Sequence, residues 1–387
     1  MAAGASAVRS RGLPGWLRGA GEQVLPFLAA LAFAGLIGAI IIVTYGENPM
    51  DVYRAIWSFS TGRPSDVARV LVNATPLVFS ALAVAVAFKA GMFNIGVEGQ
   101  YLVGMVTASA AALGLGDLPA PLLLPAVVLA AMAGAMAWAA VPAILKVRTG
   151  AHEVVTTIMM NGIAVSLVGW ALLNPLRTAE RGLVDLRTDR FAEAARMPDL
   201  PSSLGLSEVI PRSVHLTWLL PLAVVACMAV WYLIYRTRLG YGVRAVGSSA
   251  GSAEAGGISI GATQLKVFLV SGALAGLVGL NHLIGDRGFL GQNYESGLGF
   301  AGIAVAFLGR NHPVGVFLAA VLFGMLGRGE EAVQITSNVP REIIIILQGV
   351  LILSVVVAYE LTRRSIVRRR QREVRAAEPD AAGEAVA

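Results

Sequence analysis

Charged residues are scarce in this chain. Only 14% of its 387 residues are Asp, Glu, Lys or Arg, 56% are hydrophobic, and the mean hydropathy is +0.70. A soluble domain of ordinary composition carries about a quarter charged residues. The low charge therefore excludes an ordinary soluble domain and indicates an integral membrane protein with several spans.

Cysteine and histidine are also rare. The single cysteine, Cys227, has no partner for an intrachain disulfide, and its place in an apolar run favours a small buried residue over a reactive thiol. The four histidines are scattered and lack the spacing of metal ligands: His152, His215, His282 and His312. We therefore predict neither a metal site nor a bound cofactor.

Lysine occurs only at Lys89, Lys146 and Lys266, and never after glycine. The phosphate-binding loop of ATPases requires Gly-Lys followed by Ser or Thr. The chain therefore has no such loop for ATP, and no nucleophile can be singled out for catalysis, so we predict that it is not an enzyme. Ionisable residues inside the apolar runs are sparse, whereas ion-coupled carriers usually keep such groups at membrane depth.

The hydrophobic residues form long runs, and a spanning helix needs about 20 mostly apolar residues. The fold class predicted from these runs is all-α, a polytopic membrane protein of about ten transmembrane helices. Eight or nine full spans is the alternative, because the third, eighth and ninth runs are short. The runs are 24–44, 70–88, 100–115, 121–145, 154–173, 216–235, 266–285, 297–309, 313–327 and 342–361.

Lys and Arg residues set the expected orientation. With a cytoplasmic N-terminus, the inside segments hold 18 of them and the short outside loops hold six, so both termini are predicted to be cytoplasmic. The chain then divides into an N-terminal segment 1–23, a membrane domain 24–361 and a basic, disordered tail 362–387. Two polar stretches interrupt the membrane domain. Residues 174–215 form a long outside loop, and residues 236–265 form an inside segment expected to contain a short surface helix.

A glycine-broken segment lies between the second and third apolar runs. Residues 90–100 read Ala-Gly-Met-Phe-Asn-Ile-Gly-Val-Glu-Gly-Gln. Backbone that leaves helical form at membrane depth persists only where protein or a water-filled cavity satisfies its polar groups. A second glycine-rich stretch, 285–299, follows in the other half of the chain. Broken segments in two inverted halves are typical of a central transport pathway, so two inverted pseudo-repeats are predicted.

Three stretches carry a recognisable pattern. Residues 93–100 read Phe-Asn-Ile-Gly-Val-Glu-Gly-Gln, residues 149–161 read Thr-Gly-Ala-His-Glu-Val-Val-Thr-Thr-Ile-Met-Met-Asn, and residues 238–247 read Arg-Leu-Gly-Tyr-Gly-Val-Arg-Ala-Val-Gly. Together they resemble the permease subunits of ABC importers, in the branch that handles branched-chain amino acids, simple sugars and nucleosides. The second stretch is most similar to nucleoside-type members. The residues that follow the third stretch, Ser248-Ser249 and 255–258, differ from the usual form of the family. The third stretch therefore supports membership of this permease branch more than it supports a particular substrate.

The resemblance implies a fold like that of ABC type II importers and a set of partners. Such permeases pair in the membrane, often as two paralogues in the nucleoside type. Two ATPase subunits dock on the cytoplasmic side, and an extracellular or lipid-anchored binding protein delivers the substrate. No nucleic acid is involved. The residues that would couple the ATPase to the membrane part are Ser248, Ala253, Glu254, Ala255, Gly256, Gly257 and Ile258.

The resemblance thus predicts a permease subunit of an ATP-driven importer in the cell membrane, forming the path for nucleosides or related simple sugars. Asn94, Glu98, Thr157 and Asn161 are expected near this path. Helix capping is the alternative role of Asn94 and Glu98. The alternative function is an ion-coupled secondary transporter with broken helices, and a membrane-embedded enzyme is a third class. The residues leave the substrate open among nucleosides, pentoses, other sugars and purine-like bases.

Overall fold

A computed structural model gives the architecture of the chain. Contacts divide the chain into two units, residues 1–49 with 345–387 and residues 50–344. The predicted segment 1–23 and, apart from Arg364, the predicted tail 362–387 lie outside the described residues. The structure describes residues 31–178, 185–336, 340, 343–350, 353–354, 357 and 364.

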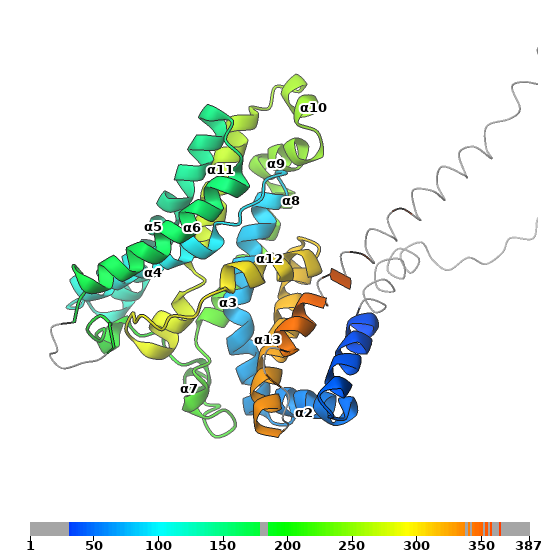
Figure 1. The fold of residues 1–387 in the computed structure, drawn as a ribbon. Helices are drawn as coiled ribbons and strands as arrows, with labels where there is room; N and C mark the ends of the chain where they lie inside the picture. The colour runs from blue at the N-terminus through cyan, green and yellow to red at the C-terminus, as the bar shows by residue number, and fades with distance from the viewer. Residues whose placement is uncertain are drawn as a thin grey trace, which may run out of the picture. The chain divides into compact units, whose positions relative to one another are not determined.

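The described residues form helices, and the connection between α6 and α8 is the longest of those that join them (Figure 1). The smaller unit contains a helix over Leu31–Thr44. The other helices are, in chain order, α2 (Pro49–Thr61), α3 (Pro64–Phe88), α4 (Val97–Gly114), α5 (Ala120–Thr149), α6 (Glu153–Leu173), η1 (Glu193–Ala195), α7 (Leu200–Ser203), η2 (Arg212–Val214), α8 (Leu219–Arg236), α9 (Arg238–Ser248), α10 (Ala250–Ala255), α11 (Ile260–Gly276), η3 (Asn281–Arg287), α12 (Leu298–Leu308) and α13 (Pro313–Thr336).

Helix α3 is the most deeply buried element of the larger unit. From residue 74 onward its sequence is almost entirely apolar, which is typical of a helix enclosed by others, and every residue from 74 to 87 is buried. Helices α8, α11, α12 and α13 pack against it. Pro76 has no N–H to donate to the Val72 carbonyl, and Asn281 Nδ2 donates to that carbonyl instead, at 3.3 Å. A neighbouring helix thereby satisfies the polar group that proline leaves unpaired.

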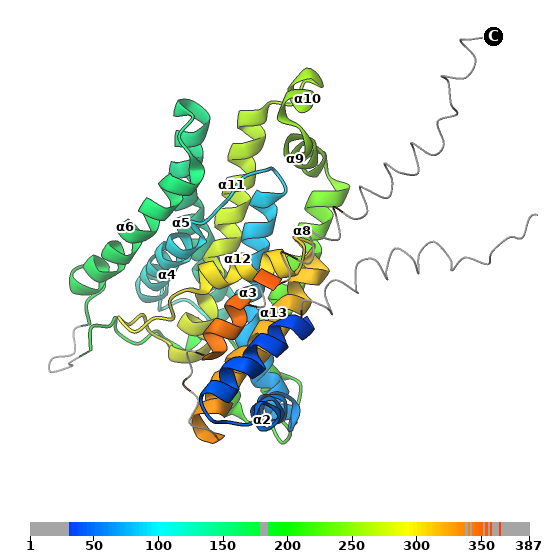
Figure 2. The ribbon, with the colours of Figure 1, turned by 45° about the vertical axis from the view of Figure 1, so that its right-hand side comes forward.

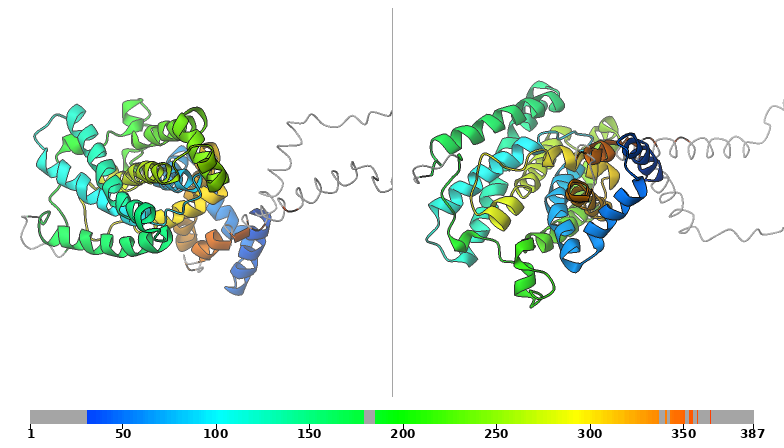
Figure 3. Two further views of the ribbon diagram at one scale, coloured as in Figure 1. Left: turned by 90° about the horizontal axis from the view of Figure 1, so that it is seen from above. Right: turned by 60° about the horizontal axis from the view of Figure 1, so that its bottom comes forward.

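Helix α11 is the second central element, and it packs tightly on α5. A Cβ added at Gly276 would lie 2.4 Å from the Ala131 carbonyl oxygen, so the two backbones touch directly. Small residues allow this close approach between membrane helices. Helices α4, α5 and α6 gather on one side of α11, whereas α12 and α13 lie on the other side, against α3 (Figure 2, Figure 3).

Five helices of the described residues are long and apolar enough to cross a membrane, and six if the segments Leu31–Thr44 and Pro49–Thr61 count together as one span. Most of α3 and of α11 with η3 is buried, whereas about a third or less of α5, α6 and α8 is. The all-α membrane fold is confirmed. The number of ten spans is not, because α4 begins with polar residues and α12 has only 11 residues.

The two ends of the larger unit differ in character. At one end lie α9 and α10, so the stretch 236–265 contains two short helices where one was expected (Figure 1). Thr237 caps α9 and Ser249 caps α10. At the opposite end lies the connection between α6 and α8, which carries α7 (Figure 1).

Candidate functional site

The predicted break is present between α3 and α4. Helix α3 ends with Lys89 at its C-cap, and Gly91 takes the left-handed conformation with φ of +72°. The Met92 N–H then donates to the Ala87 carbonyl at 3.2 Å, and α4 begins at Val97. We call residues 89–98 the first break. Met92 and Asn94 are buried, whereas Gly91 before them and Phe93 between them are exposed, so the first break is enclosed by protein on one side only.

Asn94 holds the first break from inside. Its Oδ1 accepts hydrogen bonds from the Gly96 N–H at 3.0 Å and from Gln100 Nε2 at 2.9 Å. Its Nδ2 donates to the Ser271 hydroxyl of α11 at 2.8 Å, and Ser271 in turn donates to the Ala83 carbonyl at 2.7 Å. Asn94 is only 1% exposed, and its Nδ2 also donates to Gln100 Oε1 at 2.9 Å, so the hydrogen-bonding capacity of its amide is fully used.

Asn161 and Thr157 approach the same segment from α6. Asn161 Oδ1 accepts from the Gly99 N–H at 2.9 Å, and its Nδ2 donates to the Ile95 carbonyl at 3.0 Å. Thr157 is fully buried, and a Cβ added at Gly96 would lie 3.0 Å from the Thr157 Cβ. Asn161 thus accepts from one backbone group at the start of α4 and donates to another in the first break. Thr157 packs beside these contacts.

Glu98 connects the first break to a second one. Residues 288–297, between η3 and α12, are also irregular, and we call them the second break. Glu98 Oε1 accepts from the Gly297 N–H at 2.7 Å, and Oε2 accepts from the Gly299 N–H at 2.8 Å. The Tyr101 hydroxyl donates to Oε1 at 2.9 Å. The carboxylate therefore lies at the N-terminus of α12, where unpaired N–H groups and the helix dipole favour a negative charge.

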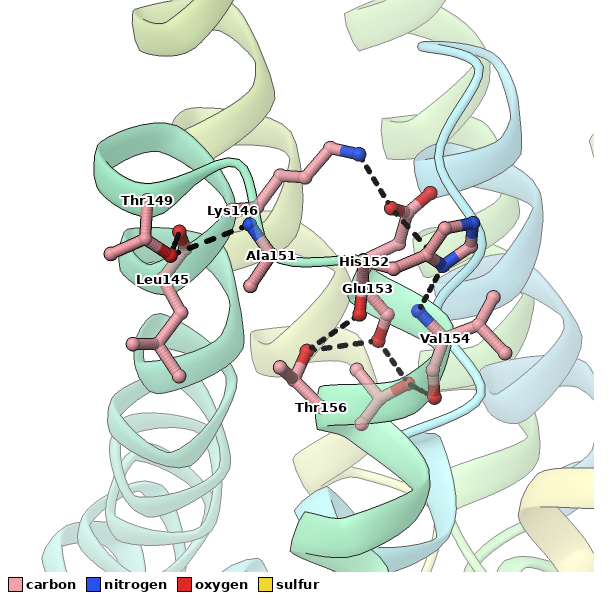
Figure 4. A network of polar contacts seen from close by, with 9 residues as sticks. Leu145, Lys146, Thr149, Ala151, His152, Glu153, Val154 and Thr156 are labelled. Carbon is pink, nitrogen blue, oxygen red and sulfur yellow. Dashed lines mark hydrogen bonds and ion pairs between the residues drawn. The ribbon is translucent and has the colours of Figure 1, made fainter.

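The turn between α5 and α6 adds another buried carboxylate, Glu153 (Figure 4). Lys146 Nζ lies 2.8 Å from Glu153 Oε2, and the side chain of Glu153 is 8% exposed. His152 Nδ1 accepts from the Val154 N–H at 3.3 Å and so caps α6. Glu153 was not among the predicted pathway residues, although it lies inside the second motif.

The structure thus brings Asn94, Glu98, Thr157 and Asn161 together around one turn. Both Asn94 and Glu98 accept backbone N–H groups beside a helix start, Asn94 from Gly96 just before α4 and Glu98 from two residues at the start of α12. Within the described part of the chain, no three His, Cys, Asp or Glu side chains are grouped as metal ligands would be. The arrangement can fix the position of backbone segments, and none of its members forms a nucleophile–base pair.

The predicted coupling residues form a surface turn at the end of α9 and around α10. Ala253 is buried, whereas Glu254, Ala255 and Gly256 are exposed. Gly257 takes the left-handed conformation, with φ of +80°, which ends α10. The same turn includes the remaining members of the set, Ser248 and Ile258.

A group of cations lies near this turn. Burial first, and then the Arg244 and Arg310 guanidinium groups, lower the pKa of the Lys89 ammonium. Burial and then the charge of Lys89 lower the pKa of the His312 imidazole. Lys89, Arg244 of α9 and Arg310 therefore lie near enough to one another to interact electrostatically at the α9–α10 end.

A polar pocket of about 160 Å³ lies on the opposite connection. The guanidinium carbons of Arg187 and Arg190 lie 5.2 and 5.6 Å from the ring centroid of Phe289, within cation–π distance. Sequence reasoning did not single out this pocket, because it joins a loop residue to a segment about 100 positions later. Its lining residues are Asp185, Leu186, Arg187, Arg287, Phe289, Gly291, Gln292 and Asn293.

Comparison with known proteins gives matches over most of the chain. The family described as the branched-chain amino acid transport system permease component matches residues 67–356. The guanosine ABC transporter permease protein of Bacillus subtilis is 35% identical over 343 residues, covering 88% of this chain and 95% of the relative. The glucose ABC transporter permease protein of Haloferax volcanii is 33% identical over 343 residues, covering 89% of this chain and 88% of the relative.

A second guanosine permease protein of Bacillus subtilis is also similar to the chain. It is 26% identical over 219 residues, covering 55% of this chain and 65% of that relative. One organism therefore has two guanosine permease proteins to which this chain is similar, with different degrees of sequence identity.

Proposed function

This chain belongs to the family of permease components of branched-chain amino acid transport systems, and we propose that it is the membrane subunit of an ATP-driven importer for nucleosides or related simple sugars. The observation that carries the proposal is the similarity over nearly the full length to a guanosine permease and to a glucose permease. Because the two relatives take different solutes, the proposed substrate class includes both the nucleoside and the sugar. A hydroxyl-bearing sugar ring is the chemistry common to nucleosides and simple sugars.

The proposed assembly contains two permease chains, two ATPase subunits and a substrate-binding protein. The presence of two guanosine permease proteins in one relative's organism supports a pair of different paralogues. The α9–α10 end is proposed to face the cytoplasm, where the ATPases dock on the exposed turn formed by Glu254, Ala255 and Gly256. The opposite connection, with its pocket beside Phe289, is proposed to face the binding protein.

The proposed transport cycle alternates access without any covalent step in this chain. ATP binding closes the ATPases and moves the coupling segment, and the helices packed on that segment rock. The central path opens to one side and then to the other. Asn94, Glu98, Thr157 and Asn161 are proposed to lie near this path. Their contacts support the role of setting the position of the two breaks that border it.

Uptake in cells tests the proposal. Radiolabelled guanosine, uridine and ribose are given to cells with and without the gene, before and after depletion of ATP. We expect nucleoside uptake that requires both the gene and ATP. Loss of ribose uptake alone would support the importer function and contradict nucleosides as its substrates. Uptake that follows a proton or sodium gradient without an ATPase would identify an ion-coupled secondary transporter instead.

A further inference from the structure

Helix α9 touches the first break through backbone alone. A Cβ added at Gly247 would lie 2.2 Å from the Lys89 carbonyl oxygen and 3.3 Å from the Gly91 nitrogen. No side chain lies between the two segments at this point. Protein interiors are close-packed, so a backbone-to-backbone contact cannot yield by changing a rotamer. A displacement of the last turn of α9 toward α3 must therefore displace residues 89–91.

The other end of the first break has a contact of the same kind. A Cβ added at Gly299 would lie 2.4 Å from the Glu98 nitrogen and 2.7 Å from its Cα. The Glu98 carboxylate adds its two bonds to the N–H groups of Gly297 and Gly299. The first break is therefore held between α9 at residue 89 and the start of α12 at residue 98.

The residues between these two contacts are braced on several sides. Asn94 Nδ2 donates to the Ser271 hydroxyl of α11, and Asn94 Oδ1 accepts from the Gly96 N–H. Asn161 of α6 bonds to the Ile95 carbonyl. A segment with so many fixed points moves as one body and does not absorb a push by local bending.

We propose that Gly247 is a positioning residue, which transmits movement of the α9–α10 coupling segment through the first break, and then through Glu98, to the start of α12. The inference rests on the proposed function, since it takes the ATPase to act on α10. It assigns a route between the coupling segment and the second break. Small shifts at one site become larger rearrangements when packed elements have two discrete arrangements.

The test compares Gly247→Ala with Gly169→Ala in the purified complex of permease, ATPase and binding protein in proteoliposomes. Gly169 in α6 is the control, because it lies outside the coupling segment and an added Cβ there meets nothing within 4 Å. We expect Gly247→Ala to assemble and hydrolyse ATP while uptake per ATP falls by roughly tenfold, the upper part of the range for coupling variants. Gly169→Ala should match the wild type in all three measurements.

Two results with these variants would overturn the proposal. Normal uptake per ATP by Gly247→Ala is one of them. Failure of Gly247→Ala to assemble is the other, because the contact would then be a folding contact and not a transmitting one. Absence of ATP-dependent uptake in the wild-type complex would instead contradict the proposed function. Failure of the importer function can therefore be told apart from failure of the proposed route through Gly247.

A measurement on the wild-type complex does not depend on any variant. Trapping the ATPases with vanadate should change amide hydrogen exchange in α9–α10, in residues 89–98 and in residues 297–299 together. An unchanged exchange rate at residues 89–98, with changes at the other two segments, would show that the signal takes another route.

Discussion

At the scale of single residues, Glu98 is a charged side chain that is unfavourable to bury and that lies at a specific position. A buried charge is tolerated where it is hydrogen-bonded, and Glu98 accepts two backbone N–H groups and a tyrosine hydroxyl. These partners come from two segments of the chain about 200 positions apart. The carboxylate therefore fixes the distance between the two breaks as well as satisfying the start of α12.

Replacing Glu98 by alanine should destabilise the permease. The change leaves the N–H groups of Gly297 and Gly299 without their acceptor, at about 1–3 kcal/mol for each buried group. We expect a lower thermal unfolding midpoint in detergent, measured by loss of the monodisperse peak on heating. Glu254→Ala is the matched control, since Glu254 is exposed on α10. Equal midpoints for both variants would contradict the capping role of Glu98.

At the scale of elements, short helices carry the proposed function. Helix α12 has 11 residues, about 16 Å at 1.5 Å per residue, which is about half of the hydrocarbon thickness of a bilayer. Its N-terminus therefore lies inside the protein, where Glu98 satisfies it. Helix α10 is shorter still and has mainly exposed residues, which leaves its surface free for a partner.

A bulky residue on α10's end should separate the permease from its ATPase. In Gly256→Trp, the added Cβ finds its nearest atom, the Ala253 carbonyl oxygen, at 3.4 Å, so the fold accepts the side chain. We expect loss of ATPase co-purification and of uptake, with an unchanged unfolding midpoint. Gly114→Trp, where nothing lies within 4 Å of an added Cβ, is the control at the other end of the unit. Retained co-purification and uptake in Gly256→Trp would show that the coupling assignment is wrong.

At the scale of the whole molecule, the prediction concerns orientation. Cys227 is the single cysteine and is buried, so an introduced cysteine gives a clear labelling signal. Ser207 lies in the connection between α6 and α8, and Ser252 lies on α10; both are exposed. We expect a membrane-impermeant maleimide to label Ser207→Cys in intact cells and to label Ser252→Cys only after the membrane is opened. The reverse labelling pattern would show that the chain has the opposite orientation in the membrane.

The sequence by itself determined the class of molecule and the place of its main irregularity. Low charge and long apolar runs require a helical membrane protein, and the glycine-broken residues 90–100 marked the turn between α3 and α4. Both are local properties, which hydropathy and glycine content record directly. The family resemblance likewise depends on short contiguous motifs, and the match over residues 67–356 confirms it.

Only the tertiary structure decided which distant segments meet. The bond from Glu98 to Gly299, the bond from Asn94 to Ser271 and the contact of Gly247 with Lys89 each join residues more than 150 positions apart. No periodicity or motif encodes such pairs, because they depend on how whole helices pack. The predicted number of spans is not confirmed for a related reason. Hydropathy counts apolar runs, whereas a run such as α12 can be too short to cross the membrane and still be stable when the surrounding helices satisfy its end.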